Sequence, residues 1–442
     1  MKKQIDLPGE EISVAPKVET QERIAVIGLG YVGLPLFCAF AEKNFSVLGF
    51  DISAEKVSNL SVGIDLSRAV DAERLRALNR NFSSESQDLA DATMYFVAVP
   101  TPVDSENKPD FGPLIAACRT IGPSLCSGDV VVFESTVYPG ATEEICVPAL
   151  TAASGLQMGS DFHVAYSPER VNPGDEQHKL ENIVKVVSAS DNPTRQRVAD
   201  VYQTILDSPI YLAESIKVAE AAKVLENTQR DVNIALMNEF SKICDRLGIE
   251  TMDVIEAAST KWNFAKFVPG LVGGHCISVD PYYLVEVAAK NGLETPLISS
   301  SRSVNESVPA FIAGQVIDSL EARFGESKGH SVAVFGLTFK ENVADTRNSK
   351  SLELAQILQA QGLAVFVHDP FVASEDSVIA EFQKVTAANC GSLDVAIFAT
   401  PHDQYFGENG FLEKLAPSAM VFDLKSRIKK DQRSRFGSCW SL

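Results

Sequence analysis

The chain has 442 residues, more than one hydrophobic core usually holds, so its length predicts two or three domains. Its 45% hydrophobic content is typical of a globular protein, and its formal charge of −19 excludes nucleic acid as an expected partner because the overall field repels polyanions. Eight cysteines without a CxxC pair favour reduced thiols in the cytoplasm over a disulfide framework or a zinc knuckle.

The first 21 residues contain no apolar core of their own. We therefore expect residues 1–21 to be a flexible tail, and neither a signal peptide nor a membrane span. No repeat of 20 to 50 residues and no low-complexity tract is visible in the chain.

The ordered chain opens with an apolar strand at 24–27 that runs into Gly28, Gly30 and Gly33, followed by a helix-like segment. A second apolar strand at 45–50 ends at Asp51, at the spacing from which a carboxylate reaches a ribose diol. This G-x-G-x-x-G pattern lets the backbone approach a pyrophosphate, and Asp51 would select NAD over its 2′-phosphorylated relative by repulsion. The alternative is a tight strand-to-helix turn with an incidental acid.

Further strands are predicted at 93–99, 130–134 and 162–165, separated by amphipathic runs as in an alternating α/β domain. Each is followed by a polar loop, and these loops hold Thr101, Thr136 and Glu169. Open α/β sheets bind ligands at the carboxyl ends of parallel strands, so the three side chains are expected to face one crevice. Taken singly, each is better read as a capping or turn residue.

The alternation stops near residue 213, and residues 215–249 predict one long helix with few interruptions before Gly248. Lys223 and Asn227 stand four residues apart on it and so share a face. Together they could clamp an oxyanion, although periodicity alone favours a solvated surface pair.

The segment from Phe267 to Leu284 places Cys276 and Asp280 four residues apart behind a run of glycines. We expect a loop-to-helix junction with a helix that starts near Pro281, where the helix N-terminus would favour the Cys276 thiolate. Asp280 would face the same cleft as a base or a holder of water. A buried structural cysteine beside an N-capping aspartate is the alternative, and His275 next to Cys276 is too little for a metal site.

Helical sequence continues to about Phe324, and strands at 331–340, 364–370, 395–400 and 420–425 then predict a second, smaller α/β unit without G-x-G-x-x-G. Residues 429–442 are expected to be a frayed tail. The chain is therefore interpreted as two α/β units with a helical segment between them.

Several motifs occur together in the order and spacing of one known family: GLGYVGLP, ESTVYPGAT, SPER, the Lys223/Asn227 helix, GGHCISVDP and FKENVADTRNS. Over roughly residues 22–430 the chain resembles the UDP-glucose/GDP-mannose dehydrogenases. The resemblance implies an NAD-binding Rossmann domain at 22–212, a central all-helical dimerisation domain at 213–325 and a C-terminal Rossmann-like, UDP-binding domain at 326–428.

The resemblance also implies roles for individual residues. NAD would be held by Gly28, Gly30, Tyr31, Val32, Gly33, Asp51, Lys56, Thr101, Thr136 and Arg347. The sugar nucleotide would be held by Glu169, Lys223, Asn227, Gly273 and Lys340. The implied reaction is a four-electron oxidation of a C6 hydroxyl to a uronic acid, with catalytic roles for Cys276, Asp280, Lys223, Asn227, Thr136 and Glu169. No metal is implied, and the implied assembly is a homodimer or a higher homo-oligomer in the cytoplasm.

Within the family, TKWNF, RDVNIALMNE and PGLVGGHCISVDPYYL resemble the branch that oxidises UDP-N-acetylhexosamines for surface polysaccharides such as O-antigen and capsule. Glucose-type members carry a second glutamate four positions after the SPER glutamate, where this chain has Pro173. UDP-N-acetylglucosamine is the favoured substrate, and the galacto and manno epimers and UDP-glucose stay as alternatives.

Two readings from other classes remain open at the level of sequence. A non-catalytic nucleotide-sugar sensor would keep both α/β units without needing Cys276, Asp280 and Lys223 together. A two-electron hydroxyacid dehydrogenase would share the first domain only, would normally use a histidine base, and would yield one NADH per turnover instead of two.

Overall fold

The computed structural model describes residues 22–67, 69–104, 106–171, 179–373 and 376–442. The chain divides into two compact units, one made of residues up to 225 together with 282–287, and the other of 226–281 and 288–442. Each unit contains one sheet. The predicted tail at 1–21 and Pro173 lie outside the described residues, and the expected domain boundaries stay a prediction.

The sheet of the first unit has the strand order β3-β2-β1-β4-β5-β6-β7-β8, and its strands pair in parallel except where β6 meets β7. Its central strands are short and, apart from the exposed Arg23 at the start of β1, buried along their length, as strands covered on both faces are. The strands are β1 (Arg23–Ile27), β2 (Ser46–Phe50), β3 (Phe82–Ser83), β4 (Met94–Val97), β5 (Val130–Phe133), β6 (His163–Tyr166), β7 (Lys185–Ala189) and β8 (Ile210–Leu212).

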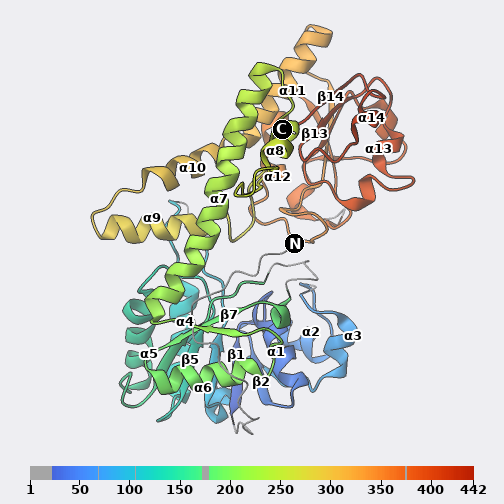
Figure 1. Cartoon of the computed structure of the whole chain (residues 1–442). Coiled ribbons are helices and arrows are strands. Elements are labelled where there is room, and N and C mark those ends of the chain that lie inside the picture. The colour runs from blue at the N-terminus through green and yellow to red at the C-terminus, as the bar shows by residue number, and fades with distance from the viewer. Residues whose placement is uncertain (1–21, 68, 105, 172–178, 374–375) are drawn as a thin grey trace. The chain divides into compact units, whose positions relative to one another are not determined.

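Helices surround these strands (Figure 1). They are α1 (Gly33–Glu42), α2 (Ala54–Ser61), α3 (Ala72–Ala77), α4 (Gly112–Ile121), α5 (Val147–Ser154) and α6 (Asn192–Gln203). Side-chain caps fix several of their starts: Asp191 accepts the Thr194 N–H at the start of α6, and Ser53 accepts the Lys56 N–H at the start of α2.

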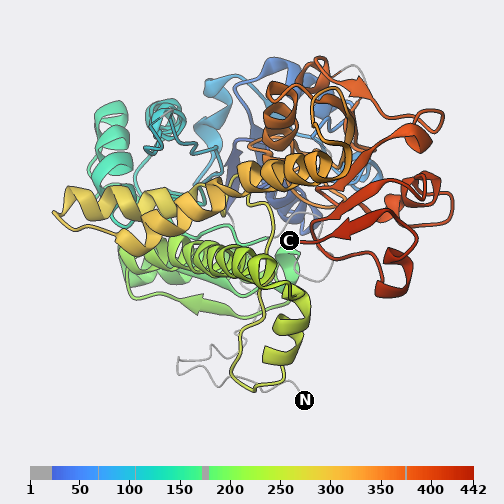
Figure 2. The same cartoon turned by 90° about the horizontal axis from the view of Figure 1, so that it is seen from above.

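The sheet of the second unit has the order β11-β10-β9-β12-β13-β14 and is parallel throughout. Alternate residues of β9 enter different cores, Val332 and Val334 on one face and Ala333 and Phe335 on the other. These strands, orange to red in Figure 2, and their helices are β9 (Ser331–Phe335), β10 (Ala364–His368), β11 (Gln383–Lys384), β12 (Val395–Phe398), β13 (Met420–Asp423), β14 (Ser438–Trp440), α12 (Lys350–Ala360), α13 (Phe411–Lys414) and α14 (Lys430–Arg433).

The two sheets share one local device at the ends of their first two strands. Gly28 follows β1 with φ +91° and Gly336 follows β9 with φ +85°, a left-handed conformation that favours glycine. Asp51 follows β2 and accepts the Leu29 N–H at 2.9 Å. In the second sheet Asp369 follows β10 and accepts the Leu337 N–H at 2.6 Å, so both carboxylates bind the turn that the glycine begins.

The two carboxylates differ in the side chain that contacts them. Asp369 Oδ2 lies 2.9 Å from Nε2 of His402, which is fully buried. Since His402 Nδ1 accepts the Asn342 N–H, Nε2 carries the ring proton and donates it to Asp369. Asp369 thus accepts a side-chain hydrogen bond from a buried histidine, whereas Asp51 accepts one from the partly exposed Lys56.

The part of the chain between the sheets is helical, as predicted. It consists of α7 (Ile216–Leu247), α8 (Thr251–Ala258), α9 (Asp280–Lys290), α10 (Pro296–Glu306) and α11 (Val308–Phe324). The predicted long helix is α7, which is continuous and ends one residue before Gly248 (Figure 1). Within the described residues, no helix is both long and apolar enough to cross a membrane.

The expectation of a frayed tail at 429–442 is wrong. Residues 430–433 form α14, and Ser438–Trp440 add β14 to the sheet beside β13. Although the segment is mostly polar, two apolar side chains attach it to the second unit. The Trp440 ring packs against Phe311 and Phe422, and Leu442 is buried. Strand β7 in the first unit is a further element that the sequence did not predict. It places the buried Lys185 next to the loop that follows β6.

Candidate active site

The three glycines after β1 are constrained differently. A Cβ on Gly33 would lie 1.9 Å from the Gly28 carbonyl oxygen, and one on Gly28 would lie 3.0 Å from that of Ala98, so the protein's own backbone requires both glycines. A Cβ on Gly30 would meet no protein atom within 4 Å. Space is therefore left in front of Gly30, between Leu29 and Tyr31, where a pyrophosphate would approach the backbone.

Asp51 lies beside this cradle. It is buried, and its carboxylate accepts the Leu29 N–H at 2.9 Å, the Ser53 N–H at 3.0 Å and the Lys56 ammonium at 2.8 Å. The predicted NAD residues Gly28, Tyr31, Val32, Gly33, Asp51 and Lys56 therefore lie in one turn and the helix that follows β2. Their arrangement fits the pyrophosphate and ribose of a dinucleotide.

The loops after β4 and β5 are joined directly, since the Thr101 hydroxyl donates to the Thr136 carbonyl oxygen at 2.7 Å. Tyr283, which belongs to the same unit, donates its hydroxyl to the Thr101 carbonyl oxygen at 2.6 Å. Two of the three predicted strand-end residues are thus brought together by one hydrogen bond.

Glu169, the third strand-end residue, is connected to a buried charge cluster that sequence reasoning missed. Lys185 on β7 is fully buried and lies 2.9 Å from Glu134 and 3.7 Å from Glu169. The Tyr202 hydroxyl donates to Glu134, and the Lys185 ammonium lies 5.0 Å from the Tyr202 ring centre. Burial raises the pKa of Glu134 even though Lys185 acts to lower it.

Another buried carboxylate, Glu220 on α7, holds the loop that follows Thr136. It accepts the Gly140 N–H at 2.5 Å and the Thr142 N–H at 2.9 Å. Burial raises the pKa of Glu220 to about 7, against the lowering effect of these hydrogen bonds. No motif marks this residue, because a glutamate on a long helix is ordinarily a surface residue.

Lys223 and Asn227 lie one turn apart on α7, as predicted, and Lys223 is buried. The Asn227 amide donates to Asp280 Oδ2 at 2.5 Å. Asp280 is the first residue of α9 and is also buried. A carboxylate that is out of bulk water and oriented by an amide can hold or accept a proton at a defined position.

Cys276 lies four residues before α9, in a turn closed by hydrogen bonds from the Val279 and Asp280 N–H groups to the Cys276 carbonyl oxygen at 3.1 and 2.8 Å. Its side chain is exposed, unlike a structural cysteine in a core. Next to it, burial and the Arg347 charge lower the pKa of His275. The predicted loop-to-helix junction is confirmed, with the helix starting at Asp280 instead of Pro281.

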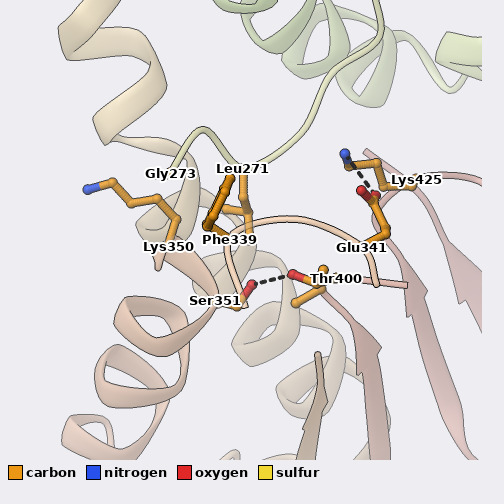
Figure 3. Close-up of a pocket in the computed structure, with 9 residues that line it drawn as sticks. Leu271, Gly273, Phe339, Glu341, Lys350, Ser351, Thr400 and Lys425 are labelled. Atoms are coloured by element: carbon orange, nitrogen blue, oxygen red, sulfur yellow. Dashed lines mark hydrogen bonds and ion pairs between the residues drawn. The ribbon is translucent and has the colours of Figure 1, made fainter. Parts of the chain in front are cut away.

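The glycine run before Cys276 lies against the loop that precedes α12. A Cβ on Gly273 would come within 2.5 Å of the Asn348 carbonyl oxygen, so this close approach requires glycine. The run also borders a small pocket in the second unit (Figure 3). The residues lining it are Leu271, Gly273, Phe339, Glu341, Lys350, Ser351, Ala399, Thr400 and Lys425.

Charged side chains mark this pocket. Lys425 lies 3.1 Å from Glu341 and, although burial acts to raise it, keeps the pKa of that carboxyl below its ordinary value. The predicted residue Lys340 lies between the lining residues Phe339 and Glu341. Arg347 is about half exposed and pairs with Asp345 at 2.7 Å. The second unit thus holds Asn227, Gly273, Cys276, Asp280, Lys340 and Arg347.

Three family models match successive parts of the chain. They describe the NAD binding domain (residues 22–206), the central domain (217–307) and the UDP binding domain (333–430) of the UDP-glucose/GDP-mannose dehydrogenase family. The chain belongs to this family. The dehydrogenases of this family use NAD, and the turn from Gly28 to Gly33 together with Asp51 fits that cofactor.

Similar proteins include the UDP-N-acetyl-D-glucosamine 6-dehydrogenases of Pseudomonas aeruginosa and Salmonella typhi. The first is 43% identical over 93% of this chain and 98% of its own length, and the second is 44% identical over 93% and 97%. Among solved structures, the UDP-D-ManNAc dehydrogenase of Pyrococcus horikoshii is 30% identical with a TM-score of 0.81, over 92% of this chain and 96% of that one. The predicted family and three-part fold class are confirmed.

Proposed function

We propose that this family member oxidises the C6 hydroxyl of UDP-N-acetylglucosamine to a carboxylate with NAD. The chain is 43–44% identical, over nearly its whole length, to two proteins named for that reaction, and this identity is the main support. The exposed Cys276 beside the buried, amide-held Asp280 supports it, because a nucleophile and a base close in sequence suit an oxidation that passes through a covalent intermediate.

The proposed oxidation removes four electrons in two steps and needs NAD, the Cys276 thiol and water. NAD, when bound, accepts one hydride in each of two oxidations. In the first, C6 loses a hydride and its hydroxyl loses a proton, which leaves an aldehyde. The Cys276 thiolate then forms a C–S bond to that carbon, and loss of a second hydride from the thiohemiacetal gives a thioester. Water breaks the C–S bond, and the products are the carboxylate and the free thiol.

Asp280 is proposed to orient and deprotonate the water that cleaves the thioester, and Asn227 keeps its carboxylate in place. The family resemblance gives Lys223 and Asn227 the stabilisation of oxyanions, which is worth on the order of 3 kcal/mol of barrier for each well-placed donor. Roles for Thr136 and Glu169 in catalysis, and for Gly273 and Lys340 in sugar-nucleotide binding, are proposed on the same ground.

An NADH assay over UDP-sugars with and without a 2-acetamido group tests the substrate. UDP-N-acetylglucosamine is expected to give the highest kcat/KM and two NADH per sugar. A galacto or manno epimer as the best substrate would correct the epimer alone. UDP-glucose as the best substrate would overturn the assignment to the N-acetylhexosamine branch, and NAD binding without turnover would favour a sensor.

We also propose that the chain works as a homodimer in the cytoplasm. Helix α7 carries exposed apolar side chains at Val218, Leu225, Leu236, Ile243 and Leu247, a stripe that a second copy would cover. All eight cysteines are free thiols, as expected for a reducing compartment. Light scattering should give a dimer mass that falls to the monomer mass in a Leu236→Glu, Ile243→Glu double variant.

A further inference from the structure

Asn238 on α7 holds the backbone of the cysteine segment at Gly270. Its Oδ1 accepts the Gly270 N–H at 2.8 Å, and its Nδ2 donates to the Gly270 carbonyl oxygen at 3.0 Å. Asn238 is fully buried, and Pro269 and Gly270 are buried as well. Both hydrogen-bonding groups of one peptide residue are therefore satisfied by a single side chain, away from water.

A second row of buried polar side chains fixes the orientation of the Asn238 amide. Its Nδ2 also donates to Asn305 Oδ1 at 2.8 Å, and the Asn305 amide donates to Asp231 Oδ1 at 2.7 Å. Arg302, which is buried, donates to the same Asp231 oxygen at 2.5 Å. Turning the Asn238 amide over would set its oxygen against two acceptors and its nitrogen against a donor, so one orientation is strongly preferred.

The same segment has a second anchor closer to the thiol. The Asn348 amide donates to the Gly274 carbonyl oxygen at 3.1 Å, and the Ser278 hydroxyl donates to that oxygen at 2.6 Å. Cys276 therefore follows two places at which asparagine amides hold the backbone, Gly270 and Gly274. Its own side chain is exposed, so burial of the thiol does not determine where it lies.

We propose that Asn238 is a positioning residue that sets the place of Cys276 for attack on the aldehyde. This inference rests on the proposed four-electron oxidation. The first hydride transfer needs no thiol, whereas thiohemiacetal formation needs the sulfur at bonding distance from C6. A displacement of about 1 Å from such a geometry can cost on the order of 100-fold in rate. Loosening Gly270 should thus impair the second oxidation selectively.

Asn238→Asp is the informative variant. It keeps the acceptor for the Gly270 N–H but sets a carboxylate oxygen against the Gly270 carbonyl and Asn305 Oδ1. In single turnovers with excess NAD, we expect NADH per sugar to fall from two toward one. Released aldehyde, trapped with an aminooxy probe, should rise on the order of tenfold or more. The rate of the first NADH should stay within about threefold of the wild-type rate.

Asn233→Asp is the matched control, because Asn233 is on the same helix and its amide donates only to the Gln229 carbonyl oxygen among the partners that the structure describes. It should still give two NADH and no aldehyde. Asn305→Ala removes the support behind Asn238 but leaves the bonds to Gly270, so it should act in the same direction and less strongly. Thermal unfolding of each variant identifies the temperatures at which all are folded.

The rate of Cys276 alkylation by iodoacetamide as a function of pH is a readout that needs no substrate. It should change in Asn238→Asp and not in Asn233→Asp. Two NADH per sugar from folded Asn238→Asp, or equal loss of both hydride transfers, would overturn the inference. If the wild-type protein itself yields one NADH per sugar, the proposed function fails instead, and the alkylation profiles still decide whether Asn238 positions the thiol.

Discussion

The Asn227 side-chain amide donates a 2.5 Å hydrogen bond to Asp280 Oδ2 and so ties α7 to the first residue of α9. The bond orients a carboxylate that is only 2% exposed. A carboxylate held in this way is positioned to take a proton from water at a defined place.

Asp280→Asn should keep the fold and slow the release of product. Without a carboxylate to activate water, thioester hydrolysis should fall by on the order of 10²–10⁴. Intact-protein mass spectra taken after mixing with UDP-sugar and NAD should show the acyl-enzyme accumulating. Glu169→Gln is the comparison, and accumulation in that variant alone would transfer the role of base to Glu169.

Cys276→Ser should fold and bind NAD like the wild-type protein, since the two side chains differ little in volume. Sustained turnover should fall by roughly a thousandfold, equal to about 4 kcal/mol of barrier, because a hydroxyl is a far weaker nucleophile at neutral pH. Steady-state NADH formation measures the loss. Cys126, which is also exposed, supplies the control variant Cys126→Ser. Full activity of Cys276→Ser would remove the thiol from the mechanism.

Asp51→Asn should relax the choice of cofactor. The wild-type carboxylate repels a 2′-phosphate, whereas the variant leaves Lys56, now without its acid, to pair with it. The ratio of kcat/KM for NADP to that for NAD should rise on the order of tenfold to a hundredfold, or about 1.4–2.7 kcal/mol. Glu55→Gln on the same helix should leave the ratio unchanged. An unchanged ratio in Asp51→Asn would dismiss Asp51 as the selecting residue.

Glu220 should make stability depend on pH. Its folded pKa of about 7 lies above its ordinary value of 4.5, so the stability gained by the protonated form is present below pH 4.5 and is lost as pH rises through 7. Urea unfolding of the wild type and of Glu220→Gln should show their difference shifting against the wild type by up to roughly 3 kcal/mol over that range. A pH-independent difference would mean that Glu220 titrates normally.

The sequence was most informative where a function needs fixed spacing. Gly28, Gly30 and Asp51 could be found because one turn and one strand end determine their separation, and Cys276 and Asp280 because they belong to a single turn. The described parts of both units contain these residues where the motifs placed them.

The residues that support the site could not be found in the same way. Asn238 meets Gly270, and Lys185 meets Glu134, only through tertiary packing across long stretches of chain. The residues next to an asparagine on a helix do not indicate which distant group it will bind. A lysine in the sequence is ordinarily interpreted as a surface residue, even when its neighbours are apolar. The prediction of a frayed tail at 429–442 failed for a related reason, because the structure of this segment depends on contacts of Trp440 and Leu442 with residues that are distant in sequence.

The hydrogen bonds of Asp369 bear on how an aspartate at the end of the second strand of an α/β sheet is interpreted. An aspartate after the second strand accepts hydrogen bonds from the amides of the turn whether or not a dinucleotide binds, so its presence alone does not identify a dinucleotide site. In the second sheet the aspartate is also met by a side chain contributed much later in the chain, His402. An aspartate at this position is therefore evidence for a dinucleotide site only together with the glycine pattern, as at Gly28, Gly30 and Gly33.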